Sequence, residues 1–229
     1  MWHVVGHGWA VRLLQKGLED GRVTHAYLFA GPPQVGKTTL ALEFARALLC
    51  TGEHPPCDDC PACRRVQAGT HPDLRRVEGM GKGGAILIEQ VRELRQGAAL
   101  APVHGPYRVY VVPHMERATA EAANALLKTL EEPPPQVVLL LTTSHLASLL
   151  PTIVSRCQVL VLRPLPQEEV AVALWERWHL AEADAALLAR LSGGRLGWAV
   201  RASQDPQVLA HRQTWLDALH QALRGSRLQ

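Results

Sequence analysis

The sequence predicts an α/β fold with a parallel sheet, and three observations support this prediction. Short apolar runs alternate with segments of helical periodicity along the first 164 residues, which is typical of strands joined by crossover helices. The chain has 229 residues, of which 47% are hydrophobic and 20% are charged, enough to bury a core of ordinary size. After residue 164 only helical patterns continue, so we expect a domain boundary there and a small helical unit beyond it.

The predicted elements follow one another in a regular order. Apolar runs bounded by turn residues predict the strands, and apolar positions at helical spacing predict the helices. The predicted strands are residues 27–30, 73–77, 109–112, 137–143 and 159–162. The predicted helices are residues 11–18, a helix that ends at residue 49, a helix through residues 91–94, and 119–132, 168–178, 182–191 and 196–202.

A phosphate-binding loop follows the first predicted strand. Residues 31–38, GPPQVGKT, match the pattern G-x-x-x-x-G-K-[ST] in full and lie between an apolar run and a helical pattern. In such a loop the backbone N–H groups close around phosphates, the lysine reaches the outer phosphates and the hydroxyl ligates Mg²⁺. The sequence therefore predicts nucleotide contacts from Gly31, Gly36, Lys37, Thr38 and Thr39.

The acidic residue that completes such a site is missing from its expected position. The best candidate strand, residues 109–112, runs into Pro113 and His114 and not into Asp or Glu. Proline cannot ligate Mg²⁺, and histidine is a poor substitute for a carboxylate that orients water. Glu116 is the nearest acidic residue that could be recruited. We therefore predict a loop that can hold phosphate but hydrolyses ATP poorly.

Four of the five cysteines form the array C-x6-C-x2-C-x2-C at Cys50, Cys57, Cys60 and Cys63. Closely spaced C-x2-C pairs suit tetrahedral zinc, and four sulfur ligands leave no open position, so the predicted site is structural. Disulfides or four unrelated thiols are the alternatives. The spacing and a cytoplasmic setting favour a zinc knuckle over residues 50–63.

Composition restricts the setting of the protein. No apolar run approaches the roughly 20 residues that span a bilayer, and the N-terminus does not have the pattern of a signal peptide. The sequence therefore predicts a cytoplasmic protein without membrane contact. The net charge of +3 is too small to argue for nucleic-acid binding on its own.

Several motifs together resemble the AAA+ subunits of bacterial clamp loaders. They are HAYLFAG at residues 25–31, the cysteine array, HPD at 71–73, ANALLKTLEEPP at 123–134 and SRC at 155–157. The resemblance covers residues 5 to 205, nearly the whole chain. It implies a RecA-like domain with a zinc knuckle over residues 1–164, followed by a three-helix lid over residues 165–205.

The same resemblance implies partners and an assembly. Residues 206–229 would be a linker and the start of a helical collar that joins five subunits, and we expect this collar to be incomplete. The implied partners are motor-type AAA+ subunits and the delta subunit. The sliding clamp and primer-template DNA would be reached through the assembly.

Departures from the family pattern favour a non-hydrolysing clamp-loader subunit. The resemblance places the family's acidic pair on Pro113 and His114, and its γ-phosphate-sensing lid arginine on Gly197. The sensor position on the strand after the Asn124 helix is retained as Thr142 or Thr143, and we select Thr143. We expect no independent ATPase activity and at most weak binding of ATP or ADP. The alternatives are an ATP-hydrolysing motor-type subunit and a zinc-knuckle module that binds nucleic acid.

Arg156, in the motif Ser155-Arg156-Cys157, is the predicted catalytic residue. In the family this arginine extends into the nucleotide pocket of the neighbouring subunit. A planar guanidinium that is always charged can donate two hydrogen bonds to γ-phosphate oxygens. The alternative is a surface arginine that caps the preceding helix. The resemblance favours an arginine finger that acts in trans.

Overall fold

The computed structural model describes residues 2–225 and divides into two compact units, Met1–Arg163 and Pro164–Gln229. The first unit contains the sheet, the phosphate-binding loop and the cysteine array. In the part of the second unit that the structure describes, every regular element is a helix. Among the described residues, no helix combines the length and apolarity that crossing a bilayer requires.

The first unit is built on a sheet of five strands in the order β2-β3-β4-β1-β5, and every pairing between them is parallel. Non-consecutive neighbours require crossover connections, which the helices supply. The strands are β1 (Ala26–Ala30), β2 (Leu74–Arg76), β3 (Arg108–Val112), β4 (Val137–Thr143) and β5 (Gln158–Val161). The predicted strand over residues 73–77 is shorter in the structure because only Leu74–Arg76 pairs with β3.

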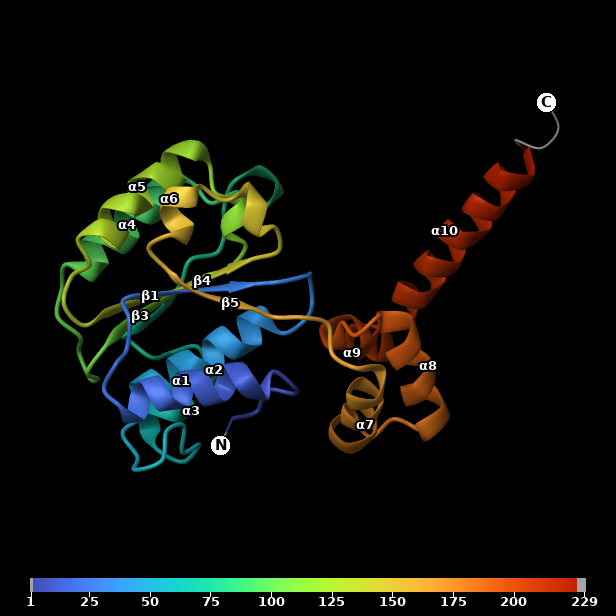
Figure 1. The fold of residues 1–229 in the computed structure, drawn as a ribbon, viewed down its shortest axis with the longest axis horizontal. Helices are drawn as coiled ribbons and strands as arrows, with labels where there is room; N and C mark the ends of the chain where they lie inside the picture. The colour runs from blue at the N-terminus through green and yellow to red at the C-terminus, as the bar shows by residue number, and fades with distance from the viewer. Residues whose placement is uncertain (1, 226–229) are drawn as a thin grey trace. The chain divides into compact units, whose positions relative to one another are not determined.

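Helices cover both faces of this sheet (Figure 1). One face carries α1 (Gly8–Glu19), α2 (Lys37–Leu49) and α3 (Pro61–Gln67), and the other carries α4 (Ile88–Ala98), α5 (Ala120–Glu131) and α6 (Pro151–Val154). A sheet that is buried on both faces needs strands that are apolar throughout. The strands β1, β3 and β4 are buried at every residue, which is why their sequences are continuous apolar runs.

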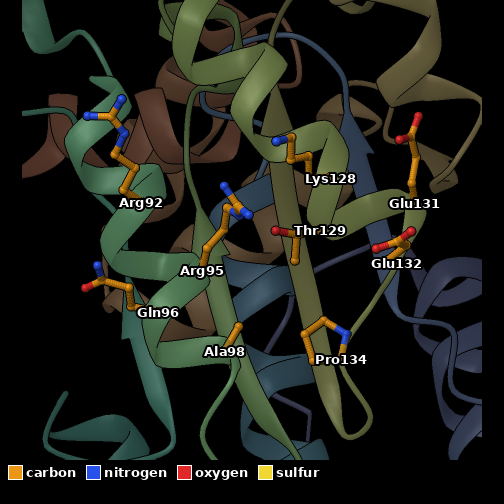
Figure 2. A pocket seen from close by; sticks show the side chains of 9 residues that line it. All are labelled: Arg92, Arg95, Gln96, Ala98, Lys128, Thr129, Glu131, Glu132 and Pro134. Carbon is orange, nitrogen blue, oxygen red and sulfur yellow. The ribbon is translucent and has the colours of Figure 1, made fainter.

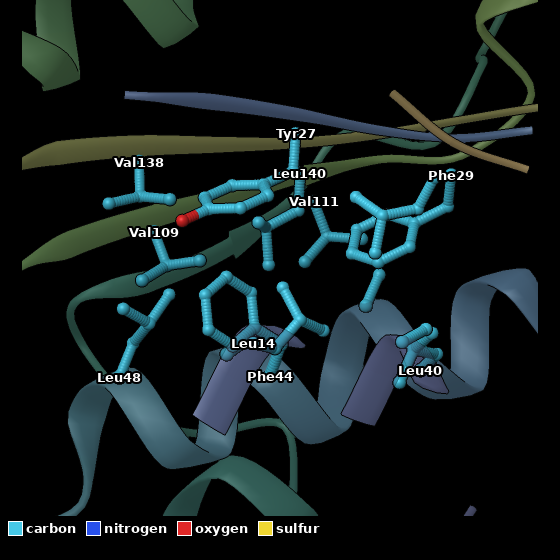
Figure 3. Close-up of a cluster of buried hydrophobic side chains, with 14 of the residues drawn as sticks. Leu14, Tyr27, Phe29, Leu40, Phe44, Leu48, Val109, Val111, Val138 and Leu140 are labelled. Carbon is cyan, nitrogen blue, oxygen red and sulfur yellow. The ribbon is translucent and has the colours of Figure 1, made fainter. Parts of the chain in front are cut away.

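Alternate residues of each strand enter the two halves of the core. On the face covered by α1 and α2, the rings of Tyr27 and Phe44 meet edge to face with centroids 4.9 Å apart (Figure 3). Phe29 points to the same face as Tyr27, whereas Leu28 packs against the helices on the other side. This alternation follows from the two-residue period of a strand. The predicted α/β class with a parallel sheet is confirmed.

The second unit contains α7 (Gln167–Trp178), α8 (Glu182–Ser192), α9 (Leu196–Gln204) and α10 (Pro206–Gly225). The turn between α8 and α9 depends on glycine. Gly194 has φ +79°, and a Cβ atom there would lie 2.3 Å from the carbonyl oxygen of Leu165. Residues 206–225 of the predicted linker and collar form α10, and residues 226–229 of that prediction lie outside the described residues.

Candidate nucleotide and metal sites

The phosphate-binding loop lies where the carboxyl ends of the central strands meet. Ala30 at the end of β1 pairs with Thr143 at the end of β4, and β3 ends beside β4. In open parallel sheets, ligands bind outside the carboxyl ends of the strands. The topology therefore brings residues 31–38 together with the segments that follow β3 and β4.

The backbone of this loop depends on its two glycines. Gly31 has φ +149°, and a Cβ atom there would lie 2.2 Å from the carbonyl oxygen of Leu162. Gly36, with φ +101°, is the N-cap of α2 and provides no side-chain cap. The first N–H groups of α2 are therefore left for an external acceptor, and a helix N-terminus favours an anion.

Lys37 is buried, with a relative exposure of 5%. Its Nζ donates hydrogen bonds to the carbonyl oxygens of Gly31 and Pro32, both at 2.7 Å, and to Oγ of Ser144 at 3.2 Å. Burial lowers the pKa of Lys37, and the charge of Glu116 opposes this shift. The lysine therefore lies within the loop beside an acidic residue.

Thr38 and Thr39 occupy the first turn of α2, and Thr38 is the less exposed of the two. Thr143 is completely buried at the end of β4. Its Oγ1 accepts a hydrogen bond from the N–H of His145 at 3.1 Å. All the predicted nucleotide-binding residues thus lie on the loop, the start of α2 or the adjoining end of β4.

The segment directly after β3 consists of Pro113 and His114, the two residues that the sequence places where an acidic pair is expected. Pro113 is buried, and the His114 side chain is 47% exposed in a left-handed conformation with φ +56°. The N–H of His114 donates to Oγ1 of Thr142 at 3.2 Å. The carboxyl end of β3 therefore carries no acidic side chain at the two positions where the family has its acidic pair.

His7 contacts the phosphate-binding loop, and no motif in the sequence marks this contact. His7 is buried, and its Nε2 lies 2.8 Å from the carbonyl oxygen of Val35 within the loop. His7 also caps the start of α1 with a left-handed backbone, φ +53°. No spacing pattern marks such a contact, because it depends on the N-terminal segment returning to the loop in three dimensions.

The four cysteines of the array form one cluster. Their sulfur atoms all lie within 4.8 Å of one another, and the sulfurs of Cys50 and Cys60 are 3.9 Å apart. Four sulfurs around a tetrahedral zinc at about 2.3 Å would be roughly 3.8 Å apart. The cluster therefore has the donor set and the dimensions of a closed metal site.

Backbone N–H groups stabilise negative charge on these sulfurs. Cys60 caps α3, and its Sγ accepts from the N–H of Cys63 at 3.3 Å. Burial opposes ionisation of Cys60, but N–H groups of Cys63 and Thr51 outweigh it and lower the pKa of the thiol to about 6. Burial raises the pKa of Cys63 to about 12. Bringing all four thiolates together requires a cation.

A buried arginine attaches the cluster to α2. Arg46 is 1% exposed and forms ion pairs with Glu43 at 2.6 Å and with Asp58 at 2.7 Å. Asp58 lies within the cysteine array and has a left-handed backbone, φ +69°. The array is therefore joined to the helix that begins at Lys37.

Arg156 follows the short helix α6, and its side chain is 34% exposed. Its guanidinium lies 2.9 Å from Oε1 of Glu131 and donates to the carbonyl oxygen of Thr152 at 2.9 Å. Arg156 therefore lies after α6, where it pairs with the last residue of α5, and not on the phosphate-binding loop of its own chain.

A groove between α4 and α5 includes the same glutamate in its lining (Figure 2). It has a volume of about 770 Å³. Arg95 and Lys128 point into it from the two helices. Both lie in the last turns of their helices, where a cation stabilises the C-terminus, so their positions require no ligand.

Gly197 lies on the first turn of α9 in the second unit. The structure therefore has glycine, without a side chain, where the resemblance places the lid arginine.

These features define the class of protein. A phosphate-binding loop at the carboxyl edge of a five-stranded parallel sheet, followed by a helical unit, is a AAA+-type fold. The same fold occurs in the RuvB Holliday junction branch migration motor of Thermotoga maritima, with a TM-score of 0.59. That structure is 18% identical and covers 90% of this chain and 64% of its own, so it supports the fold alone.

The chain belongs to the family described as DNA polymerase III, delta subunit, whose profile matches residues 6–166. Subunit delta' of Bacillus subtilis is 34% identical over 92% of this chain and 64% of its own length. Subunit tau of Escherichia coli K12 is 37% identical over 84% of this chain and 31% of its own. The predicted resemblance to clamp-loader subunits is confirmed, and delta' is among the relatives that the chain matches.

A solved structure with a higher identity supports the same family. The DNA polymerase III gamma subunit-related protein of Thermotoga maritima is 25% identical, with a TM-score of 0.54, over 81% of this chain and 57% of its own. The chain thus spans less than two thirds of the length of each of these polymerase III relatives.

Proposed function

We propose that this chain is a non-hydrolysing subunit of the DNA polymerase III clamp loader, acting in the cytoplasm during DNA replication. It would assemble with motor-type tau or gamma subunits and with delta in a pentamer that loads the sliding clamp onto primed DNA. The proposal rests on the family assignment and on the similarity to delta' along 92% of the chain.

One observation supports the non-hydrolysing role more than any other. An intact loop with Lys37 lies beside a β3 strand that ends in Pro113 and His114. Hydrolysis needs metal coordination and an oriented water, and neither residue supplies a carboxylate. The pocket retains its anion-binding backbone, which is compatible with weak binding of ATP or ADP.

The proposed contribution to catalysis is made in trans by Arg156. About a third of the Arg156 side chain is exposed, and about half of the side chain of its partner Glu131. Both groups are therefore accessible to a neighbouring subunit. A guanidinium donated by a neighbour stabilises the charge that develops on the γ-phosphate.

We further propose that Cys50, Cys57, Cys60 and Cys63 hold one structural zinc ion. Four sulfur donors within 4.8 Å favour zinc over the harder cations Mg²⁺ and Ca²⁺, which take oxygen ligands. When bound, the metal would crosslink the array without taking part in hydrolysis.

Reconstitution tests the proposed function. The chain is mixed with tau and delta subunits of the same organism, and the mass of the complex and clamp loading on primed DNA are measured. We expect a defined complex and loading that depends on this chain. Absence of a complex, together with DNA binding by the isolated chain, would favour the zinc-knuckle nucleic-acid module.

A motor-type subunit is the second candidate, and two observations favour it. The identity to tau is 37%, compared with 34% to delta'. Glu116 also provides a carboxylate near Lys37. ATP turnover by the isolated chain distinguishes this candidate from the non-hydrolysing subunit.

A further inference from the structure

The nucleotide pocket contains a carboxylate close to its lysine. Glu116 lies on the short 3-10 helix η2 (Met115–Arg117), which follows β3, and its side chain is 14% exposed. Burial alone would raise the pKa of Glu116, but its own N–H, the hydroxyl of Thr143 and the N–H of Ser144 outweigh this effect and lower the pKa. Oε1 of Glu116 also lies 3.4 Å from Nδ1 of His114. Within the described residues, its buried Oε2 has no hydrogen-bond partner.

Ser144 connects this carboxylate to Lys37. The serine hydroxyl accepts a hydrogen bond from Nζ of Lys37 at 3.2 Å, and the N–H of the same serine lowers the pKa of Glu116. A lysine ammonium has three donors. Its other two hydrogen bonds go to the carbonyl oxygens of Gly31 and Pro32. All three donors of the lysine are therefore occupied by the protein itself.

An incoming polyphosphate meets two obstacles in this arrangement. Lys37 must exchange three partly buried hydrogen bonds, at 2.7, 2.7 and 3.2 Å, for bonds to phosphate oxygens. The phosphate charge must also approach a carboxylate that is mostly withdrawn from water, where like charges repel more strongly than in solvent. Burial lowers the pKa of Lys37, and the charge of Glu116 partly offsets this shift. Such an effect agrees with a carboxylate close to the lysine.

We propose that Glu116 is an affinity-determining residue that keeps the phosphate-binding loop closed on itself and so weakens the binding of nucleoside triphosphates. A Mg²⁺ ligand is the competing role for an acid in this pocket. Among the described residues, Nδ1 of His114 lies 3.4 Å from Oε1 of Glu116. The groups that lower the pKa of this carboxylate include Thr143, Ser144 and His114 but not Thr38. This inference rests on the proposed function, in which the loop still binds nucleotide, and it concerns only the affinity of that binding.

The test is equilibrium titration of the full chain with ATP, once with Mg²⁺ and once with EDTA. Glu116→Gln keeps the shape and the acceptor oxygen but removes the charge. We expect this variant to bind ATP about tenfold more tightly under both conditions, because one like charge near the phosphates is removed. The control Glu121→Gln removes an exposed charge on α5 and is expected to leave the affinity unchanged.

Three results would overturn the inference: equal affinity in Glu116→Gln and the unchanged chain, weaker binding in the variant with Mg²⁺, or no binding by either protein at millimolar ATP. Glu116→Ala provides a second variant if Glu116→Gln does not fold. ATP turnover is measured in the same samples. Hydrolysis by the unchanged chain would contradict the proposed function, whereas an unchanged ATP affinity in Glu116→Gln would contradict only this inference.

Discussion

The guanidinium of Arg156 lies 2.9 Å from the carboxylate of Glu131, which links the segment after α6 to the last residue of α5. Both side chains are substantially exposed, so the ion pair itself contributes only about 0–1 kcal/mol to stability. The pair orients the guanidinium without burying it. The guanidinium therefore remains accessible at the surface of the first unit.

The first prediction concerns this arginine. Arg156→Ala removes an exposed charge and no core volume, so we expect the chain to fold and assemble. DNA-stimulated ATPase and clamp loading by the reconstituted complex should fall, by less than the roughly 10³–10⁵ of a sole arginine finger, because several pockets share the work. Arg156→Lys should not restore the rate, since an ammonium cannot form two parallel hydrogen bonds.

A matched control for this experiment is Arg12→Ala, which removes an exposed arginine from α1. It should leave loading unchanged. Wild-type loading rates in the Arg156→Ala complex would mean that Arg156 is only a surface residue that caps α6, and would contradict its role in trans.

The second prediction concerns the metal. Elemental analysis should give about one zinc per chain, and removing it with a chelator should increase proteolysis within residues 50–63 while the sheet remains folded. Cys60→Ser should have the same effect because it removes one of four ligands. Cys157→Ala changes a thiol outside the array and should retain the metal. Free titration of all four thiols in the native chain would contradict the zinc site.

The third prediction concerns the buried arginine of α2. Arg46→Ala removes the guanidinium that pairs with both Glu43 and Asp58, which keep their contacts with His3. We expect the free energy of unfolding to fall by about 1–3 kcal/mol, since two partly buried carboxylates lose their charged donor. Urea denaturation measures this change, with the exposed Arg64→Ala as control. An equal loss in both variants would show that the ion pairs do not stabilise the fold.

The strands and the loop were predictable from sequence, whereas contacts between loops were not. A strand buried on both faces, such as Val137–Thr143, has to be apolar throughout, and the loop needs glycine where φ is positive. The contacts of His7 with Val35 and of Ser144 with Lys37 join segments far apart in the chain. They depend on which loops meet at the sheet edge, and no local pattern records that.

The fourth prediction concerns pH. Burial alone would raise the pKa of Asp73, but the N–H groups of Val103 and His104, at 2.7 and 2.8 Å, outweigh it and lower the pKa. The carboxylate therefore stabilises the fold above the unfolded pKa of about 3.9, and this contribution is lost as the pH falls below about 5.

We expect Asp73→Asn to lower the free energy of unfolding by about 1.5–3 kcal/mol at pH 7, because an amide cannot accept both N–H groups equally. The difference from the unchanged chain should shrink as the pH falls below about 5. Unfolding curves at several pH values measure it, and a difference that is constant with pH would show that the charge of Asp73 does not contribute.

The most direct test of the non-hydrolysing role is steady-state ATP turnover by the purified chain, measured beside its Lys37→Ala variant with and without primed DNA. Pro113 and His114 leave the end of β3 without a carboxylate to hold Mg²⁺ or orient water. The proposed function therefore predicts turnover at background level in both proteins. Turnover in the unchanged chain that disappears in Lys37→Ala would contradict it, because a contaminating ATPase would not depend on this lysine.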